Sequence, residues 1–396
     1  MDSWTSFPPR RRARSKERRV QARAVVFAGV LGAVLSACGA TSSVAGANPG
    51  AANVNSGASP VAPAPRPSGP LTVSSSSPAS GAANVPGTAP VTIHFSTAVP
   101  AASMPQWQPA VAGKWAQVGP SALRFTPSGA FAPGTAYSLS LPAGLKSRSG
   151  ATLAKATTLH FTVEAMPTVR LQQILAQLGY LPVGFKPTAP VPTTTAAWTA
   201  SSFAPVAGTF YWRFPGAMAP LQAEWTPGPY GPMTTGAVMT FQATHGMSAT
   251  GQTSPAMWSA LLTAAAQGQQ DPRPYTWVQV SKSPLPEMLT LWQNGKVVLT
   301  SLANTGVPAM PTPDGSFPIY VRYRTQTMSG TNPNGTHYTD PGIPYVNYFH
   351  GGDAIHGYIR SSYGYPQSVG CVELPVPQAA AAWNYLHLGT VVTVTG

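Results

Sequence analysis

The segment His350-Gly-Gly-Asp-Ala-Ile-His356-Gly is followed, after a short spacer, by Ser368-Val-Gly-Cys371-Val-Glu-Leu374. A thiol becomes a nucleophile only as the thiolate, so Cys371 needs a nearby base, and His356 stands fifteen residues before it. Gly370 allows an unusual backbone conformation beside the thiol, where N–H donors are needed to stabilise an oxyanion. A Cys and a His at this distance are weak evidence alone, since buried Cys and structural His are common. If they act together, His356 comes from a neighbouring strand or loop and faces the thiol.

The N-terminus predicts export. A basic run leads into the apolar stretch 24–35, whose twelve residues are too few to span a bilayer and fit the h-region of a secretory signal. Leu35-Ser36-Ala37-Cys38 then resembles the bacterial lipobox, whose Cys is lipidated. We expect residues 1–38 to be a lipoprotein signal peptide with its lipobox, and the lipid on Cys38 to anchor the protein to the cell membrane, extracytoplasmic and facing the cell wall. An ordinary signal peptide that contains a Cys is the alternative.

Cysteine count and charge narrow the function further. The chain has two Cys, so lipidation of Cys38 leaves Cys371 without a disulfide partner, as a reactive thiol would be. The formal charge is +13, but residues 1–23 hold eight Lys/Arg and two acids, and the other +7 is spread thinly. No basic cluster with interleaved aromatic residues is present in the sequence, which argues against a nucleic-acid partner.

Composition divides the N-terminal half, after the signal peptide, into a linker and a β-rich domain. Residues 39–77 are rich in Ala, Gly, Ser and Pro and predict a flexible linker. Residues 78–164 hold short alternating segments such as 91–95 and 159–163 between turns, which favours a β-sandwich. The stretches SPASGAANVPGTAPVTIHFSTAV and APGTAYSLSLPAGLKSRSG resemble bacterial Ig-like domains. We expect His94 and His160 to face solvent or to bond locally, not to bind a metal.

Residues 168–268 have helical periodicity. Apolar residues recur through 171–178 before Gly179, a second pattern starts at Gly236, and Ser254-Pro255 is typical of a helix start. LQQILAQLGYLP, GAVMTFQATHGMSATGQ and a following W-x-x-L resemble the three-helix peptidoglycan-binding domain, with a Pro- and Trp-rich insertion at 183–230. A helical spacer that packs against the next domain is the alternative.

Residues 275–396 predict a β-rich domain with one helix at 377–386. Alternating segments at 277–280, 288–292, 297–299 and 391–394 read as strands, and Asn294-Gly295 indicates a type I′ hairpin.

The pattern HG…S-x-G-C followed by an aliphatic residue resembles the active-site signature of the L,D-transpeptidase (YkuD-type) catalytic domain. Pro344-Tyr345 to Gly352, Asn294-Gly295-Lys296, and Thr305-Gly306 followed by Pro311 to Phe317 resemble that family as well. The expected fold is therefore multi-domain and mainly β: an N-terminal Ig-like β-sandwich, a small three-helix peptidoglycan-binding-like domain and a C-terminal β-rich catalytic domain.

The resemblance implies a role for each residue of the signature. Cys371 attacks a peptidoglycan stem tetrapeptide at its third residue and expels D-Ala, while His356 serves as base and the carbonyl of Gly357 orients its ring. The N–H groups of Gly370 and Cys371 form the oxyanion hole, and Ser368 holds the turn or the substrate. A second stem's amine resolves the thioester into a 3→3 cross-link. Stem peptides are then donor and acceptor, no metal or cofactor is needed, and the oligomeric state stays open.

Two positions depart from the family pattern. Val369 replaces a frequent His, and Glu373 replaces a frequent Arg or Asn, which reverses a local charge and bears on the choice of donor or acceptor. His350, Tyr348 and Asp353 are weaker expectations for substrate binding: packing by His350, and turn capping by Asp353, are the alternatives. His337 is a further expectation, on a lid over the site.

The residues leave other functions open. The same thioester resolved by water would make an L,D-carboxypeptidase, and resolved by a free D-amino acid or a protein amine it would make an exchange or attachment enzyme. A different class is a non-catalytic cell-wall-binding lipoprotein, against which the intact pair of Cys371 and His356 argues. A cysteine protease would need other motifs around its Cys.

Overall fold

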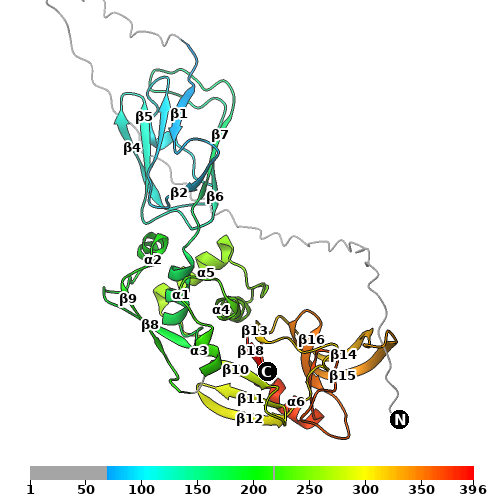
Figure 1. The fold of residues 1–396 in the computed structure, drawn as a ribbon. Helices are drawn as coiled ribbons and strands as arrows, with labels where there is room; N and C mark the ends of the chain where they lie inside the picture. Colours follow the sequence, from blue (N-terminus) through cyan, green and yellow to red (C-terminus); the bar gives the residue numbers. More distant parts are fainter. Residues whose placement is uncertain (1–68, 217–218) are drawn as a thin grey trace, which may run out of the picture. The chain divides into compact units, whose positions relative to one another are not determined.

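The computed structural model describes residues 69–216 and 219–396, whose fold is drawn in Figure 1. The expected signal peptide, Cys38 and most of the expected linker lie outside the described residues. No helix within the described ranges has the length and the apolar character needed to cross a bilayer.

The N-terminal part of the described chain is a β-sandwich. A four-stranded sheet in the order β1-β3-β5-β4 and a three-stranded sheet in the order β2-β7-β6 contribute to one apolar core. Trp107 and Phe131 are fully buried at its centre. The strands are β1 Val73–Ser77, β2 Ala82–Val85, β3 Val91–Phe95, β4 Gly113–Gly119, β5 Ala122–Pro127, β6 Ala136–Leu141 and β7 Thr157–Val163, with a short 3-10 helix η1 at Ala101–Ser103.

The ordered domain begins earlier than composition predicts. Strand β1 pairs with β3 from Val73 onward, and Leu71 is completely buried in the sandwich core, although both residues fall in the segment 39–77 expected to be linker. Strand β1 has the sequence VSSSS. Because it lacks alternating apolar residues, hydrophobic periodicity does not predict it as a strand.

The middle region is helical, but it is more than a three-helix unit. Helices α1, α4 and α5 cover the three predicted patterns, and the segment 183–230 adds the antiparallel strand pair β8–β9 and helices α2 and α3. Ser254 caps α5 by accepting the Met257 N–H at 3.2 Å, as the Ser-Pro signal predicts. The elements are α1 Thr168–Gln177, β8 Val183–Pro187, α2 Thr195–Ala200, η2 Ser201–Phe203, β9 Gly208–Trp212, α3 Ala219–Ala223, α4 Pro232–Thr244 and α5 Pro255–Gln267.

The C-terminal region holds two sheets, coloured yellow to red in Figure 1. One has the order β12-β11-β10-β18-β13, the other β14-β15-β16-β17, and apolar residues of both join α6 in one core. Asn294 and Gly295 have φ values of 47° and 76°, which makes the predicted type I′ turn. The elements are β10 Thr276–Ser281, β11 Met288–Gln293, β12 Lys296–Leu302, β13 Gly315–Pro318, β14 Val321–Thr331, β15 His337–His350, β16 Asp353–Gly357, β17 Val372–Leu374, α6 Val376–Trp383 and β18 Val391–Thr395.

The helical region and the five-stranded sheet share apolar packing. Trp277 of β10 and Val391 of β18 belong to the same buried cluster as the residues of α4 and α5. Gly236 of α4 lies so close to Gly389 that a Cβ on Gly389 would stand 2.3 Å from the Gly236 carbonyl oxygen. Two glycines therefore permit this backbone-to-backbone approach.

Candidate active site

Strand pairing brings the predicted nucleophile and base together. Strands β16 and β17 are parallel neighbours, with Ile355 opposite Val372 and His356 opposite Glu373. Cys371 directly precedes β17, and both Cys371 and His356 line one cavity of about 680 Å³. The base thus comes from a neighbouring strand, one of the two placements that the spacing allowed.

The residues before Cys371 form a tight turn held by Ser368. The Ser368 hydroxyl donates to the carbonyl of Cys371 at 2.6 Å, and the N–H of Gly370 donates to the same hydroxyl at 3.2 Å. Of the two N–H groups expected to form an oxyanion hole, the one on Gly370 is therefore engaged inside the turn.

The conformation of Gly370 excludes any other residue there. Its φ is +119°, and a Cβ would lie 2.2 Å from Oδ1 of Asp353. Only glycine adopts such a φ readily.

Two buried threonines outside the signature support this turn. Thr312 donates from its hydroxyl to the carbonyl of Gly370 at 2.8 Å and accepts the N–H of Gly306 at 2.9 Å. The carbonyl of Thr305 accepts the N–H groups of Gln367 and Ser368. Both threonines are completely buried.

A buried carboxylate, that of Glu287, fixes the position of Thr305 by hydrogen bonds. Glu287, 1% exposed, accepts the Thr305 N–H at 2.6 Å and the Thr305 hydroxyl at 2.7 Å. Burial raises the pKa of Glu287, against the lowering effect of these bonds. The motif around Thr305 and Thr312 was visible in the sequence, but Glu287 carried no signal that linked it to the site.

A hydrogen bond to the backbone orients His356, the predicted base. It is 4% exposed, and its Nδ1 lies 3.1 Å from the carbonyl oxygen of Gly357. A carbonyl only accepts, so Nδ1 carries the proton and Nε2 is left as the basic nitrogen. Burial lowers the pKa of His356, and the carboxylate of Glu373 opposes that shift. The ring is therefore unprotonated at neutral pH.

The thiol is also neutral in this arrangement. Burial raises the pKa of Cys371 to about 12, although the backbone N–H of Ala354 lowers it. The Sγ lies 4.0 Å from the carbonyl oxygen of Gly352, and within the described residues it makes no hydrogen bond to His356. Attack therefore requires the thiol to leave Gly352 and to transfer its proton during the reaction.

One wall of the cavity carries charges that the sequence did not reveal as a group. Nε and Nη2 of Arg360 each donate to Glu373 at 2.8 Å, and the guanidinium lies 4.6 Å from the centroid of the Tyr358 ring. The Tyr358 hydroxyl donates to Oδ2 of Asp340 at 3.0 Å. The unusual acid at position 373, on β17, thus faces an arginine from the loop that connects β16 to β17.

The residues that were weaker candidates for substrate binding lie apart from this charged wall. Tyr348, His350 and Asp353 are not among the residues that line the cavity. Nδ1 of His350 pairs with Oδ2 of Asp353 at 3.1 Å, and no hydrogen bond joins Asp353 to His356 in the described part of the chain. Tyr348 packs beside Cys371 in a small apolar cluster. His337 lies on β15 and does not line the cavity, whereas Tyr338 and Asp340 of the same strand do.

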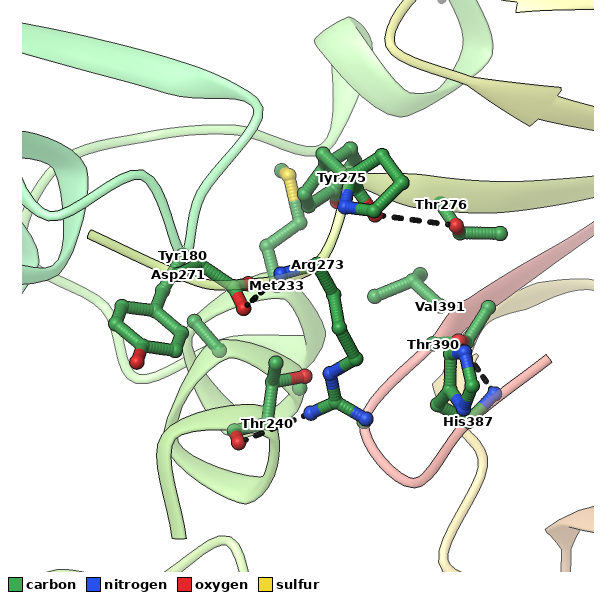
Figure 2. A pocket seen from close by; sticks show the side chains of 14 residues that line it. Tyr180, Met233, Thr240, Asp271, Arg273, Tyr275, Thr276, His387, Thr390 and Val391 are labelled. Carbon is green, nitrogen blue, oxygen red and sulfur yellow. Dashed lines mark hydrogen bonds between the residues drawn. The ribbon is translucent and has the colours of Figure 1, made fainter. Parts of the chain in front are cut away.

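A second, much smaller pocket lies where the helical region meets the sheet of β10 and β18. Its volume is about 30 Å³, enough for a water molecule. Figure 2 shows Arg273 reaching toward Thr240, with His387 across the pocket beside Thr390. Burial lowers the pKa of His387 to about 4, and the positive charges of Arg273 and Arg322 add to this shift.

Three family models match separate parts of the chain. They are a bacterial Ig-like domain at residues 67–163, a peptidoglycan binding domain at 222–261 and an L,D-transpeptidase catalytic domain at 275–394. The protein is thus multi-domain and mainly β, with an Ig-like domain, a small helical peptidoglycan-binding region and a C-terminal YkuD domain of the L,D-transpeptidase class. The peptidoglycan-binding match begins after α1, so the first of the three expected helices lies outside it.

Solved structures of the same class resemble the chain. An L,D-transpeptidase from Mycobacterium smegmatis is 13% identical, with 83% of this chain and 100% of that chain covered and a TM-score of 0.29. L,D-transpeptidase 3 from Mycobacterium tuberculosis is 12% identical, with 82% and 98% covered and a TM-score of 0.28. The catalytic domain of the E. faecium L,D-transpeptidase is 28% identical, with 30% and 96% covered and a TM-score of 0.28. No curated protein matched the chain.

Proposed function

We propose that this protein is an extracytoplasmic L,D-transpeptidase that forms 3→3 cross-links in peptidoglycan through a thioester on Cys371. The observation that carries the proposal is the cavity shared by Cys371 and His356, in which Nδ1 of the histidine is occupied by the Gly357 carbonyl and Nε2 is left basic. A nucleophile and an oriented base beside a substrate-sized cavity are the parts that acyl transfer needs.

The geometry supports proton transfer that accompanies attack, since neither group is ionised at neutral pH. The Sγ of Cys371 bonds to the carbonyl carbon of the third stem residue, and its proton passes to Nε2 of His356. The oxyanion accepts the N–H of Cys371, and it accepts that of Gly370 when this group leaves Ser368. The tetrahedral intermediate collapses, and the C–N bond to D-Ala breaks as His356 returns the proton to the leaving amine.

The second half of the reaction uses the same groups. The acceptor ammonium gives one proton to His356, and the resulting amine attacks the thioester carbonyl. The new C–N bond forms, the C–S bond breaks, and the second proton of the amine restores the thiol. The imidazolium then releases its proton to solvent.

Intact mass spectrometry of residues 39–396 with purified disaccharide-tetrapeptide tests the reaction, with Cys371→Ala as control. We expect dimers that have lost one D-Ala, absent with the control. Release of D-Ala without dimers would point to an L,D-carboxypeptidase. Unchanged substrate and no acyl-enzyme would refute catalysis and favour a non-catalytic cell-wall-binding lipoprotein.

We also propose that Cys38 is lipidated and anchors the protein to the membrane, because the sequence 35–38 resembles a lipobox. Fractionation of cells that express the full chain should place the wild type with the membranes and Cys38→Ala in the soluble exported fraction. A Cys38→Ala protein that stays with the membranes would contradict the anchor.

A further inference from the structure

We propose that the Ig-like domain binds a phosphodiester-linked anionic polymer of the cell wall, through a surface whose charged groups are all positive. The surface has two parts, a basic loop at residues 145–155 and the outer face of strands β4 and β5. It lies in a different domain from Cys371, and its role does not depend on the catalytic function.

Charge is distributed unevenly among the domains. Residues 69–163 hold five Lys/Arg and no Asp or Glu, and the first acid after them is Glu164. Residues 164–396 hold nine Lys/Arg and eight Asp/Glu, which leaves a net charge of only +1. The charge outside the N-terminal basic run is therefore not spread thinly, as composition suggested, but concentrated in the sandwich. A polyanion is attracted to such a domain and meets no carboxylate there that would repel it.

All five cations of the sandwich are exposed and are free of ion pairs. They are Lys114, Arg124, Lys146, Arg148 and Lys155. Every salt bridge within the described ranges lies in the C-terminal region, between residues 282 and 373. Binding of an anionic partner therefore breaks no existing ion pair of the sandwich.

The basic loop contains three of these cations and is tied to the sandwich. An antiparallel bridge closes the loop at Lys146, and the N–H of Arg148 donates to the carbonyl of Ala98 at 2.7 Å. Burial alternates along the chain here, because Leu145 and Ser147 are buried and the residue after each is exposed. In extended backbone this alternation places Lys146 and Arg148 on the same exposed side. The loop thus presents neighbouring cations on a fixed backbone.

The outer face of the adjacent strands β4 and β5 holds the other two cations (Figure 1). Arg124 lies opposite Ala116, two residues from Lys114, so the two cations are diagonal neighbours on one face of the sheet. Nε of Arg124 donates to the hydroxyl of Thr92 on β3 at 3.3 Å, which orients the guanidinium. Lys, Arg, Ser and Thr are side chains that contact phosphate oxygens in proteins, so this face has the groups that a phosphodiester needs.

The sandwich surface lacks the apolar groups that other anionic partners need. Val118 is the one exposed large apolar side chain in residues 69–163. Interfacial binding to a membrane uses apolar side chains beside the basic ones, and binding of single-stranded nucleic acid uses exposed aromatic rings on which bases stack. The surface therefore suits a hydrated polyanion that is held by charge and hydrogen bonds. For an exported protein, such a polymer belongs to the cell wall.

The test compares two variants of equal net charge, both made in the protein that begins after Cys38, residues 39–396. The loop variant is K146Q/R148Q/K155Q. The control variant, K186Q/K296Q/R324Q, removes three exposed cations of the other domains, none of which lines the active-site cavity. Binding to end-labelled poly(glycerol phosphate) is followed by fluorescence anisotropy between about 50 and 200 mM NaCl. Polygalacturonate and phosphatidylglycerol vesicles serve as alternative anionic partners.

The wild type and the control variant should bind poly(glycerol phosphate) with affinities within about threefold of each other, and the loop variant about tenfold or more weakly. The slope of log K against log[NaCl] should become shallower by roughly 0.7 for each phosphate contact that is lost. K114Q/R124Q, which changes the sheet face and leaves the loop intact, should also bind more weakly and with a shallower slope. It keeps the test decisive if the loop variant does not fold.

Equal weakening in the loop and control variants would overturn the proposal, because net charge and not the Ig-like surface would then govern binding. No binding by the wild type at about 50 mM NaCl would overturn it as well, as would binding to polygalacturonate or to the vesicles but not to poly(glycerol phosphate). The rate of acylation by a donor tetrapeptide should be the same in the loop variant and the wild type. Failure of the transpeptidase proposal would therefore appear as absent acyl-enzyme, and failure of this one as unaltered polymer binding.

Discussion

Two histidines of the C-terminal region have pKa values lowered by burial, yet their surroundings differ in kind. His356 has the carboxylates of Glu373 and Asp340 nearby, which oppose the shift, and lines a cavity of about 680 Å³ beside a thiol. His387 lies near Arg273 and Arg322, which add to the shift, and lines a pocket of about 30 Å³. A depressed pKa therefore does not identify a catalytic histidine. The distinguishing features are a basic nitrogen left free, a nucleophile close by and room for substrate.

The largest test of this comparison removes each histidine in turn. His356→Ala should lower the rate of acyl-enzyme formation by roughly 10²- to 10⁴-fold, the usual contribution of a general base. Cys371→Ala should abolish it, whereas His387→Gln should stay within about threefold of the wild type, because His387 does not line the active-site cavity. Stopped-flow or mass-spectrometric acylation rates check this. A comparable loss in His387→Gln, with the fold intact by circular dichroism, would erase the distinction.

Paired glycine substitutions sharpen the same contrast. Gly370 and Gly389 both have positive φ, and a Cβ on each would clash, with Asp353 Oδ1 at 2.2 Å and with the Gly236 carbonyl oxygen at 2.3 Å. Gly370→Ala should cut acylation by about 100-fold through a misplaced nucleophile. Gly389→Ala should instead lower the free energy of unfolding by about 2 kcal/mol or more, since left-handed backbone strain and the contact with α4 add up. Urea titrations and acylation rates of both variants measure whether each substitution affects stability or catalysis. The contrast fails if Gly389→Ala loses activity while its unfolding midpoint is unchanged.

Local chemistry made much of the fold predictable from sequence. The Asn294-Gly295 turn and the Ser254 cap depend on residues adjacent in the chain, and the structure confirms both. One parallel strand pair brings His356 and Cys371 together. Their spacing alone was weak evidence, and the expectation came from the resemblance of the surrounding motif to the L,D-transpeptidase signature.

The charged wall was not predictable in the same way. The register of the long β14–β15 hairpin places Asp340 at the cavity. The buried carboxylate of Glu287 accepts a hydrogen bond from Thr305, eighteen residues further along the chain. Such contacts depend on tertiary packing, and no spacing rule encodes them. Glu373 was noted as a departure from the family pattern, but its partner Arg360 could be found only from the structure.

A pair of threonines extends the comparison to supporting residues. Thr312 bonds the carbonyl of Gly370, while Thr390 accepts the N–H of His387 at 3.0 Å. Replacement of either by Val leaves a backbone group without its partner and should lower the free energy of unfolding by about 1–2 kcal/mol. Thr312→Val should also slow acylation by about tenfold, because the carbonyl it fixes belongs to the nucleophile turn. Acylation rates corrected for folded fraction provide the measurement. Equal slowing by Thr390→Val would mean that stability, not turn geometry, limits the rate.

The smallest expected effect is a pH dependence of stability at His387. Its pKa is about 4 in the folded protein, against about 6.5 in an unfolded chain, so below pH 6.5 the unfolded state binds more protons. The contribution is fully present above pH 6.5 and is lost as pH falls toward 4. His387→Gln cannot titrate and should lose less stability than the wild type between pH 7 and pH 4.5, as read from urea midpoints at both pH values. Parallel losses in the two proteins would mean that burial and the charges of Arg273 and Arg322 do not hold His387 neutral. The contrast between the two histidines would then rest on cavity size and the nearby thiol alone.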